Sequence, residues 1–272
     1  MTTTRPAEGR CGRRRWALLL LGLLPLLAAC DDWQPQHLEP GPNPFGPGDE
    51  GWAEQPHRDN PLELLATPDG RLWVTLQGSP DEPGRHVAVV DGDTVRRIAV
   101  GSGPTGLALH PSGRWIVVAN RFSNYLSVID VQQEAEVRRL PVDFYGIAPA
   151  FTPDGDELWL TNRWRDAVQV FGVRSTPTAL VVDWEAAPIP VDSNPRDLAI
   201  SADGSVVAVA ALTGTTVSLI DRRQRFETHR LELGAPASDV VVAGDFVIVA
   251  TQSACTHHLP FAGPDTDGDG QP

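Results

Sequence analysis

The sequence predicts an all-β protein in which four-stranded antiparallel sheets repeat along the chain, the arrangement of a β-propeller. Two observations carry this prediction. A Pro-Asp-Gly or closely related turn recurs, and short runs rich in Val, Ile, Leu and Trp flank each turn, as β-strands do. The five turns start at Pro68, Pro111, Pro153, Ala202 and Ala243, so successive starts lie 43, 42, 49 and 41 residues apart. A nearly constant period in this range is typical of repeat architectures.

Each repeat orders its strands in the same way around its turn. The first strands are predicted at 62–67, 106–110, 147–152, 197–201 and 239–242, and the second at 71–75, 115–119, 157–161, 206–210 and 246–250. The third are predicted at 86–91, 125–130, 167–171 and 216–221, and the fourth at 95–100, 136–142, 178–184 and 228–233. A parallel sheet is disfavoured because the sequence lacks the crossover helices it requires. A two-layer sandwich stays possible, although it does not require equal spacing.

The repeats amount to about four and a half blades. Four are complete, near 62–104, 105–146, 147–196 and 197–238, and the fifth, at 239–253, stops after two strands. An open arc of blades would leave unpaired strand edges at both ends. We therefore expect a partial ring that forms the N-terminal part of a longer protein, with the acidic loop or tail at 254–272 as the start of its C-terminal region.

Residues 1–29 are predicted to be a secretory signal peptide. A basic region that includes Arg13, Arg14 and Arg15 precedes an apolar run from 16 to 29, which is too short for a typical membrane span. The run ends in Leu-Ala-Ala-Cys and resembles a bacterial lipobox, which implies cleavage before Cys30 and a lipid on this residue. The protein would then be exported and anchored to a bacterial membrane, facing the periplasm or the cell exterior. The alternative is a plain signal peptide in which Cys30 is incidental.

The composition of the chain after residue 29 predicts a tether and an acidic surface. Residues 30–61 are rich in Pro and Gly, acidic and aperiodic, so they are predicted to form a tether. The net charge is −13, and because residues 1–29 carry five Arg and one Glu, the remainder carries −17. Such a surface repels phosphate backbones, which argues against a nucleic-acid partner. After processing, only Cys255 would keep a free thiol, so no intrachain disulfide is expected.

Several stretches resemble a known repeat. Residues 101–113 read Gly-Ser-Gly-Pro-Thr-Gly-Leu-Ala-Leu-His-Pro-Ser-Gly, followed by Val-Val-Ala-Asn at 117–120 and Leu-Ser-Val-Ile-Asp at 126–130. Residues 158–162 and 194–201 repeat parts of the match. This pattern resembles the YVTN-type, YncE-like propeller repeat over about residues 62–253. The resemblance implies a propeller and leaves the activity open, because one fold serves many functions.

Polar residues recur where the second strands end. Nine residues after the turn starts lie Gln77, Asn120, Asn162, Ala211 and Gln252. Arg121 and Arg163 follow the two Asn residues, in loops that surround the central channel in propellers of this type. Two guanidinium groups facing one channel would hold a carboxylate or phosphate bidentately, so Arg121, Arg163, Asn120 and Asn162 are candidate ligand-binding residues. The alternative is that the Arg side chains pair with acids of adjacent loops and the amides bind backbone.

The C-terminal tail contains the opening of a calcium-binding loop. Asp265, Asp267 and Asp269 alternate and a Gly follows, as in the pattern D-x-D-x-D-G. The acid expected at the twelfth position would be residue 276, beyond the last residue, so these carboxylates alone predict weak calcium binding. Cys255, His257 and His258 are interpreted as a loop thiol and two surface His, because one such cluster does not close a tetrahedral site.

The sequence contains no nucleophile elbow, zinc-protease motif or phosphate loop. It therefore favours a lipid-anchored propeller outside the cytoplasm, acting as a binding or scaffold module for an unidentified protein or a small anionic ligand. Three alternatives stay open. The propeller could belong to a redox protein fused to a c-type cytochrome or di-haem peroxidase module, it could be a lactonase-like hydrolase, or it could be a purely structural surface module.

Overall fold

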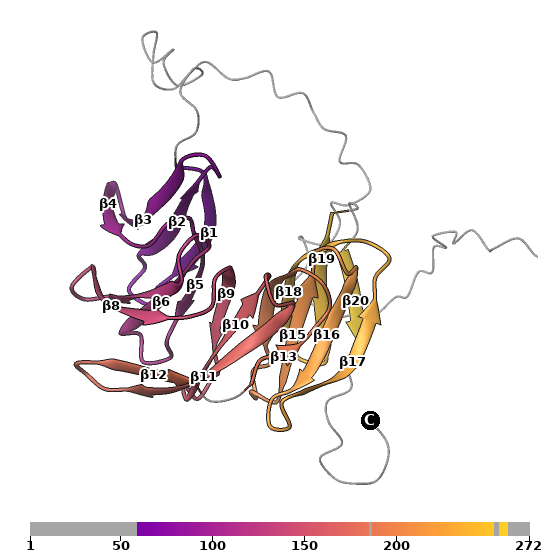
Figure 1. The fold of residues 1–272 in the computed structure, drawn as a ribbon. Helices are drawn as coiled ribbons and strands as arrows, with labels where there is room; N and C mark the ends of the chain where they lie inside the picture. Colours follow the sequence, from indigo (N-terminus) through magenta and orange to yellow (C-terminus); the bar gives the residue numbers. More distant parts are fainter. Residues whose placement is uncertain (1–58, 185–186, 253–255, 261–272) are drawn as a thin grey trace, which may run out of the picture. The chain divides into compact units, whose positions relative to one another are not determined.

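The computed structural model describes residues 59–184, 187–252 and 256–260, the last of these by backbone alone. All of them belong to one compact unit. Every regular element in these ranges is a β-strand, and consecutive strands pair antiparallel into five sheets, called blades 1 to 5 in chain order (Figure 1). The predicted fold class, an all-β protein built from four-stranded antiparallel sheets, is confirmed.

The blades follow one another along the chain. Blade 1 contains β1 (Pro61–Ala66), β2 (Leu72–Gly78), β3 (Pro83–Asp91) and β4 (Thr94–Ala99), and blade 2 contains β5 (Pro104–Leu109), β6 (Trp115–Asn120), β7 (Tyr125–Asp130) and β8 (Ala135–Pro141). Blade 3 contains β9 (Gly146–Phe151), β10 (Glu157–Asn162), β11 (Ala167–Ser175) and β12 (Leu180–Trp184), with β13 (Ile189–Pro190) also paired to β11. Blade 4 contains β14 (Pro195–Ile200), β15 (Val206–Ala211), β16 (Thr216–Asp221) and β17 (Phe226–Glu232), and blade 5 contains β18 (Ala237–Ala243), β19 (Phe246–Thr251) and β20 (Thr256–Pro260).

Two strands were not predicted from the sequence. The short strand β13 precedes blade 4, and β20 adds a third strand to the fifth repeat by pairing with β19. The segment Thr256–Pro260 was expected to lie in the acidic loop or tail at 254–272. Its sequence, Thr-His-His-Leu-Pro, shows little alternation and ends in a residue that strands avoid, so it carries little strand signal. Two strands of the fifth repeat were predicted, and the structure has three.

The recurring turn is closed by a short side-chain hydrogen bond. The Thr67 hydroxyl donates to the Asp69 carboxylate at 2.6 Å, and the same bond joins Ser201 to Asp203 at 2.5 Å. Gly70 follows with φ of 88°, in the left-handed region that glycine enters without a steric penalty. The acids of these turns therefore have a structural role.

The hydrophobic core lies between neighbouring blades. Alternate residues of β6 face opposite ways: Trp115 and Val117 pack against blade 3, whereas Ile116 and Val118 pack against blade 1. Two further clusters of the same kind join blade 3 to blade 4 and blade 4 to blade 5. Because both faces of an inner blade are buried, its strands are apolar at consecutive positions, and the packing fixes each blade beside the next.

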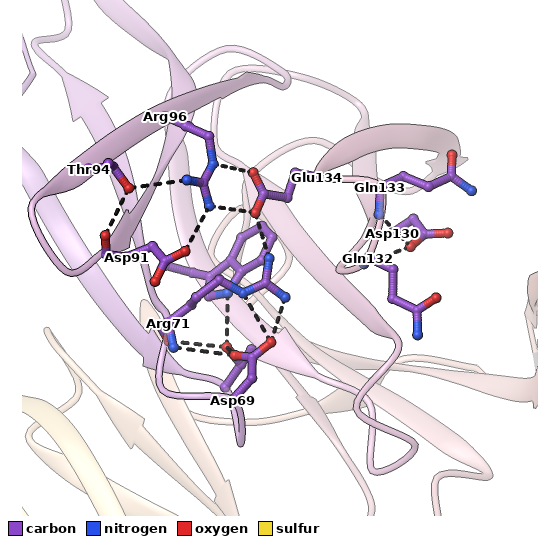
Figure 2. A network of polar contacts seen from close by, with 11 residues as sticks. Asp69, Arg71, Asp91, Thr94, Arg96, Asp130, Gln132, Gln133 and Glu134 are labelled. Atoms are coloured by element: carbon purple, nitrogen blue, oxygen red, sulfur yellow. Dashed lines mark hydrogen bonds and ion pairs between the residues drawn. The ribbon is translucent and has the colours of Figure 1, made fainter.

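Ion pairs also join the blades. Glu134, in the loop between β7 and β8, accepts hydrogen bonds from Arg71 at 2.6 Å and from Arg96 at 2.5 Å (Figure 2). These interactions lower the pKa of Glu134, chiefly through the hydrogen bond from Arg96. A second set joins blades 3 and 4, where Glu157 of β10 accepts hydrogen bonds from Arg222 and Arg225, each at 2.9 Å.

Candidate functional site

A β-bulge in the innermost strand of every blade positions the candidate site. In β1, β5, β9, β14 and β18, one extra residue opposes the second strand near the start of the innermost strand, which is a β-bulge. The bulged residues of all five blades line one channel: Leu62, Glu63, Thr105, Gly106, Ile147, Ala148, Arg196, Asp197, Ser238 and Asp239. Gln77, Arg121 and Arg163 complete the lining. The channel leaves about 120 Å³ to water-sized molecules, which is room for a small group only.

Side chains satisfy the backbone groups that the bulges release. The N–H of Glu63 donates to the Thr75 hydroxyl and the N–H of Ala148 donates to the Thr161 hydroxyl, each at 3.0 Å. The N–H of Val240 in blade 5 instead donates to the Asp197 carboxylate of blade 4 at 2.9 Å. The bulges are therefore fixed features, since buried backbone N–H groups need partners.

Arg121 and Arg163 occupy equivalent places, directly after β6 and β10. The N–H of Arg121 donates to Gly103 at 2.8 Å and the N–H of Arg163 donates to Tyr145 at 3.2 Å. Both guanidinium-bearing residues line the channel, as the repeat alignment predicted. The structure therefore brings together the two Arg residues that the sequence singled out.

The alignment of the first and fifth repeats with the other three was wrong by one residue, and in the fifth the N–H of Gln252 donates to Pro236 as that of Arg121 does to Gly103. The sequence paired Gln77 with Asn120, but the N–H of Gln77 donates to Asn60 at 3.1 Å, which is the bond that Arg121 makes to Gly103. For Gln77 the error arises from the length of the turn between the first and second strands. Five residues, 67–71, separate the paired Ala66 and Leu72 of blade 1, whereas six, 110–115, separate the corresponding pair of blade 2. Gln77 thus corresponds to Arg121, and both line the channel.

The two Arg side chains contact rings and an amide. The Arg121 guanidinium lies over the rings of Phe122 and Tyr145, at 5.0 and 5.4 Å, and its buried Nε has no hydrogen-bond partner. Arg163 donates through Nε to the Asn194 amide oxygen. Within the described part of the chain neither Arg forms an ion pair, whereas the neighbouring Arg165 pairs with an acid at 2.6 Å. The alternative that Arg121 and Arg163 pair with acids of adjacent loops is therefore not what the described residues show.

A third Arg that the sequence did not single out, Arg196, also lines the channel. Burial lowers the pKa of Arg163, and the positive charges of Arg121 and Arg196 lower it further. The three guanidinium groups are thus close enough to repel one another. An anion placed between them would relieve this repulsion.

Carboxyl groups line the same channel. The pKa of Glu63 is raised to about 7, first because the surrounding strands exclude water and then because Asp197 and Asp239 carry like charge. Burial likewise raises the pKa of Asp197 to about 6. The Glu63 residue as a whole remains exposed to solvent. Sequence reasoning missed these acids because they gather only once five bulges face one axis.

The two Asn residues support the loops. The buried Asn120 side chain donates to the carbonyl of Tyr125 at 3.1 Å and to the Ser127 hydroxyl at 3.0 Å. Asn162 donates to the Phe144 carbonyl at 3.2 Å, and its amide oxygen accepts hydrogen bonds from backbone N–H groups of the next loop. Neither lines the channel, so the structure separates them from the Arg pair.

Several predicted sites lie outside the described residues. These are the lipidation site Cys30, the tail carboxylates Asp265, Asp267 and Asp269, and the thiol of Cys255. In the ranges that the structure does describe, no three His, Cys, Asp or Glu residues gather closely enough to hold a metal ion. Those ranges also contain no helix that is long and apolar enough to span a membrane.

Comparison with known proteins supports the fold and goes no further. No family model matches the chain, and no curated protein matches it. Solved structures do match. A functionally unknown protein from Desulfotomaculum acetoxidans has a TM-score of 0.64 at 14% identity, with 75% of this chain and 66% of that chain covered. Hydrazine synthase from Kuenenia stuttgartiensis has a TM-score of 0.57 at 20% identity, with 74% and 66% covered.

The description of a third matching structure names the fold. The β-propeller domain of Cps50 (Swd1) from Myceliophteria thermophila has a TM-score of 0.58 at 12% identity, with 71% of this chain and 67% of that chain covered. With bladed antiparallel sheets around one channel, the protein is a β-propeller. It spans about two thirds of the length of these structures, slightly less in the first two.

Proposed function

We propose that this β-propeller is a binding module whose channel mouth holds the anionic group of a ligand between Arg121 and Arg163. The observation that carries the proposal is a pair of equivalent guanidinium groups on one channel, without an ion-pair partner among the described residues. Arg196 adds a third positive charge to the same lining.

The chemistry of the Arg side chain fits this role. A guanidinium group presents several N–H donors in a fixed plane and binds carboxylate or phosphate through two parallel hydrogen bonds. The buried Nε of Arg121 lacks a partner, and an unmet buried donor is costly unless a ligand supplies an acceptor. The protein as a whole is acidic, so the channel mouth provides selective rather than general attraction for anions.

Calorimetric titration with sodium phosphate and sodium acetate tests the proposal. The wild-type protein should bind at least one of these anions, and the double variant Arg121→Ala/Arg163→Ala should bind neither. Arg174→Ala is the matched control, because Arg174 is an exposed Arg of β11 that pairs with the exposed Asp183. Equal binding by the wild type and the double variant would refute the assignment.

The cellular setting is proposed from the sequence. We propose that a YVTN-type propeller is displayed outside the cytoplasm by a lipid on Cys30, with the acidic segment 30–61 as tether, and that it serves as a binding or scaffold module rather than as a nucleic-acid-binding protein. Metabolic labelling with palmitate in a bacterial host should mark the wild type and leave Cys30→Ser unlabelled. We also propose weak calcium binding by Asp265, Asp267 and Asp269, which a calcium titration of the full chain would check.

A further inference from the structure

An aromatic cluster lies beside the two Arg residues. The ring of Tyr145 contacts Phe122 at 6.1 Å, Phe144 at 4.7 Å and Trp164 at 6.4 Å between centroids. The Arg121 guanidinium lies over two of these rings, so the cluster is continuous with the proposed anion site. We call Phe144, Tyr145 and Trp164 the aromatic platform.

The backbone of Tyr145 is strained. It has φ of 68°, a left-handed conformation that costs a residue with a large side chain about 1–2 kcal/mol. The equivalent residues before β1, β5 and β14 are Asn60, Gly103 and Asn194, with φ of 35°, 62° and 63°. Gly and Asn are the residue types that adopt this conformation most readily. Four of the five blades thus have a left-handed residue at this position, blade 5 has Pro236 there, and only blade 3 has a Tyr.

The platform is open to ligands. The Trp164 side chain is 76% exposed and that of Phe144 is 44% exposed, whereas Trp73, Trp115 and Trp159 are buried between blades. The ring planes of Tyr145 and Trp164 lie 31° from parallel. Exposed aromatic side chains that contact one another form a surface on which a planar group can stack.

We infer that the ligand is a small anion that carries a planar aromatic ring. This inference rests on the proposed function: Arg121 and Arg163 hold the carboxylate or phosphate, and the platform stacks the ring. The channel has room for a small charged group alone, and the platform lies beside the Arg121 guanidinium that lines it, so a ring attached to that group would reach the platform. The strain at Tyr145 is then explained by the ring that this residue contributes.

Matched pairs of anions test the inference. Benzoate and cyclohexanecarboxylate carry the same charge and similar apolar area, but only benzoate is planar and aromatic. The wild type should bind benzoate at least about fivefold more tightly than cyclohexanecarboxylate, as expected for one stacking contact. Tyr145→Asn places at this position the residue found in two other repeats, so the backbone accommodates it, and it should bring the ratio close to one. Trp164→Ala should do the same.

Controls separate the two proposals. Trp184→Ala removes an exposed Trp far along the chain on β12 and should leave the ratio unchanged. Acetate and phosphate, which carry no ring, measure anion binding by the wild type without any stacking contact. If the wild type binds these simple anions but shows no preference for benzoate, the aromatic inference is wrong and the proposed function stands. If it binds no anion at all, both are wrong.

Discussion

Glu63 and Asp197 contribute to stability in the direction opposite to most surface acids. Their pKa values in the folded protein, about 7 and about 6, lie above the ordinary values of 4.5 and 3.8. The folded state therefore binds more protons than the unfolded state between about pH 4 and pH 7, and stability falls as pH rises through this window. The pKa of Asp154 shifts in the opposite direction. Burial raises this pKa, but the hydrogen bonds to the carboxylate outweigh burial and lower it to about 2.

The stability of the folded protein to urea should depend on pH. The wild type should be most resistant to urea near pH 4–5 and should lose stability up to about pH 7. Glu63→Gln/Asp197→Asn should flatten this fall, because neither amide titrates and the Asn oxygen can still accept the hydrogen bond from Val240. Urea unfolding curves measured at pH 5, 6, 7 and 8 check it. Parallel profiles for wild type and variant would contradict it.

The same two acids should regulate anion affinity. As they take up protons, the negative charge of the channel lining falls, and an anion bound in the channel is repelled less. Sulfate, whose own charge is constant in this range, should bind roughly two- to fivefold more tightly at pH 5.5 than at pH 8. Calorimetry at the two pH values measures this ratio. The double amide variant should show a ratio near one, and an unchanged ratio would show that these acids do not face the bound anion.

At the scale of single strands, the bulge in β9 makes a specific prediction. Thr161 is fully buried and its hydroxyl accepts the hydrogen bond from the Ala148 N–H. Thr161→Val keeps the shape and leaves this donor unmet, which should cost about 1–3 kcal/mol of unfolding free energy. Thr178→Val, in an exposed loop, should change it by less than about 0.5 kcal/mol. Chemical denaturation of both variants measures the difference, and equal effects would show that water satisfies the Ala148 donor.

Strands and turns were predictable from the sequence because they depend on local patterns. The buried run at β6 and the Pro-Asp-Gly turn of blade 1 are examples. The bulges were not predictable, because the extra residue in β1 or β14 shows only against its partner strand. The one-residue error at Gln77 has the same origin, since a hairpin one residue shorter shifts everything that follows it.

The candidate site was predictable only in part, for the same reason. Arg121 and Arg163 were found because they recur at one place in the repeat. Arg196 and Glu63 lie on innermost strands of different blades, and their closeness follows from how the blades gather around the channel. The strained Tyr145 carried no sequence signal, because the left-handed position is visible only in the backbone.

At the scale of the whole molecule, blades are held together by apolar packing and by a few charged contacts. Leu64 of β1 is exposed, whereas Leu107, at the equivalent position of β5, is buried against blade 1. The first blade therefore presents a face that an inner blade would cover, which is the arrangement expected of a partial ring. Between the inner blades 3 and 4, Glu157 also accepts a hydrogen bond from the Trp159 indole at 2.8 Å.

The contact between blades 3 and 4 should depend on Glu157. Its side chain is only 13% exposed, and its loss would leave the charges of Arg222 and Arg225 without this partner. Glu157→Ala should lower the unfolding free energy by about 2–4 kcal/mol. Glu232→Ala, on the exposed side of β17, should have little effect. Urea denaturation compares the two, and a loss below about 1 kcal/mol for Glu157→Ala would show that packing alone holds these blades.

The account depends most on two Arg residues facing one channel and holding an anion there. A crystal structure of the protein soaked in tungstate, recorded at the tungsten absorption edge, tests this directly. The account predicts an anomalous peak at the channel mouth, within hydrogen-bonding distance of the guanidinium groups of Arg121 and Arg163. Bound tungstate elsewhere with an empty channel mouth, or guanidinium groups turned away from each other, would contradict it.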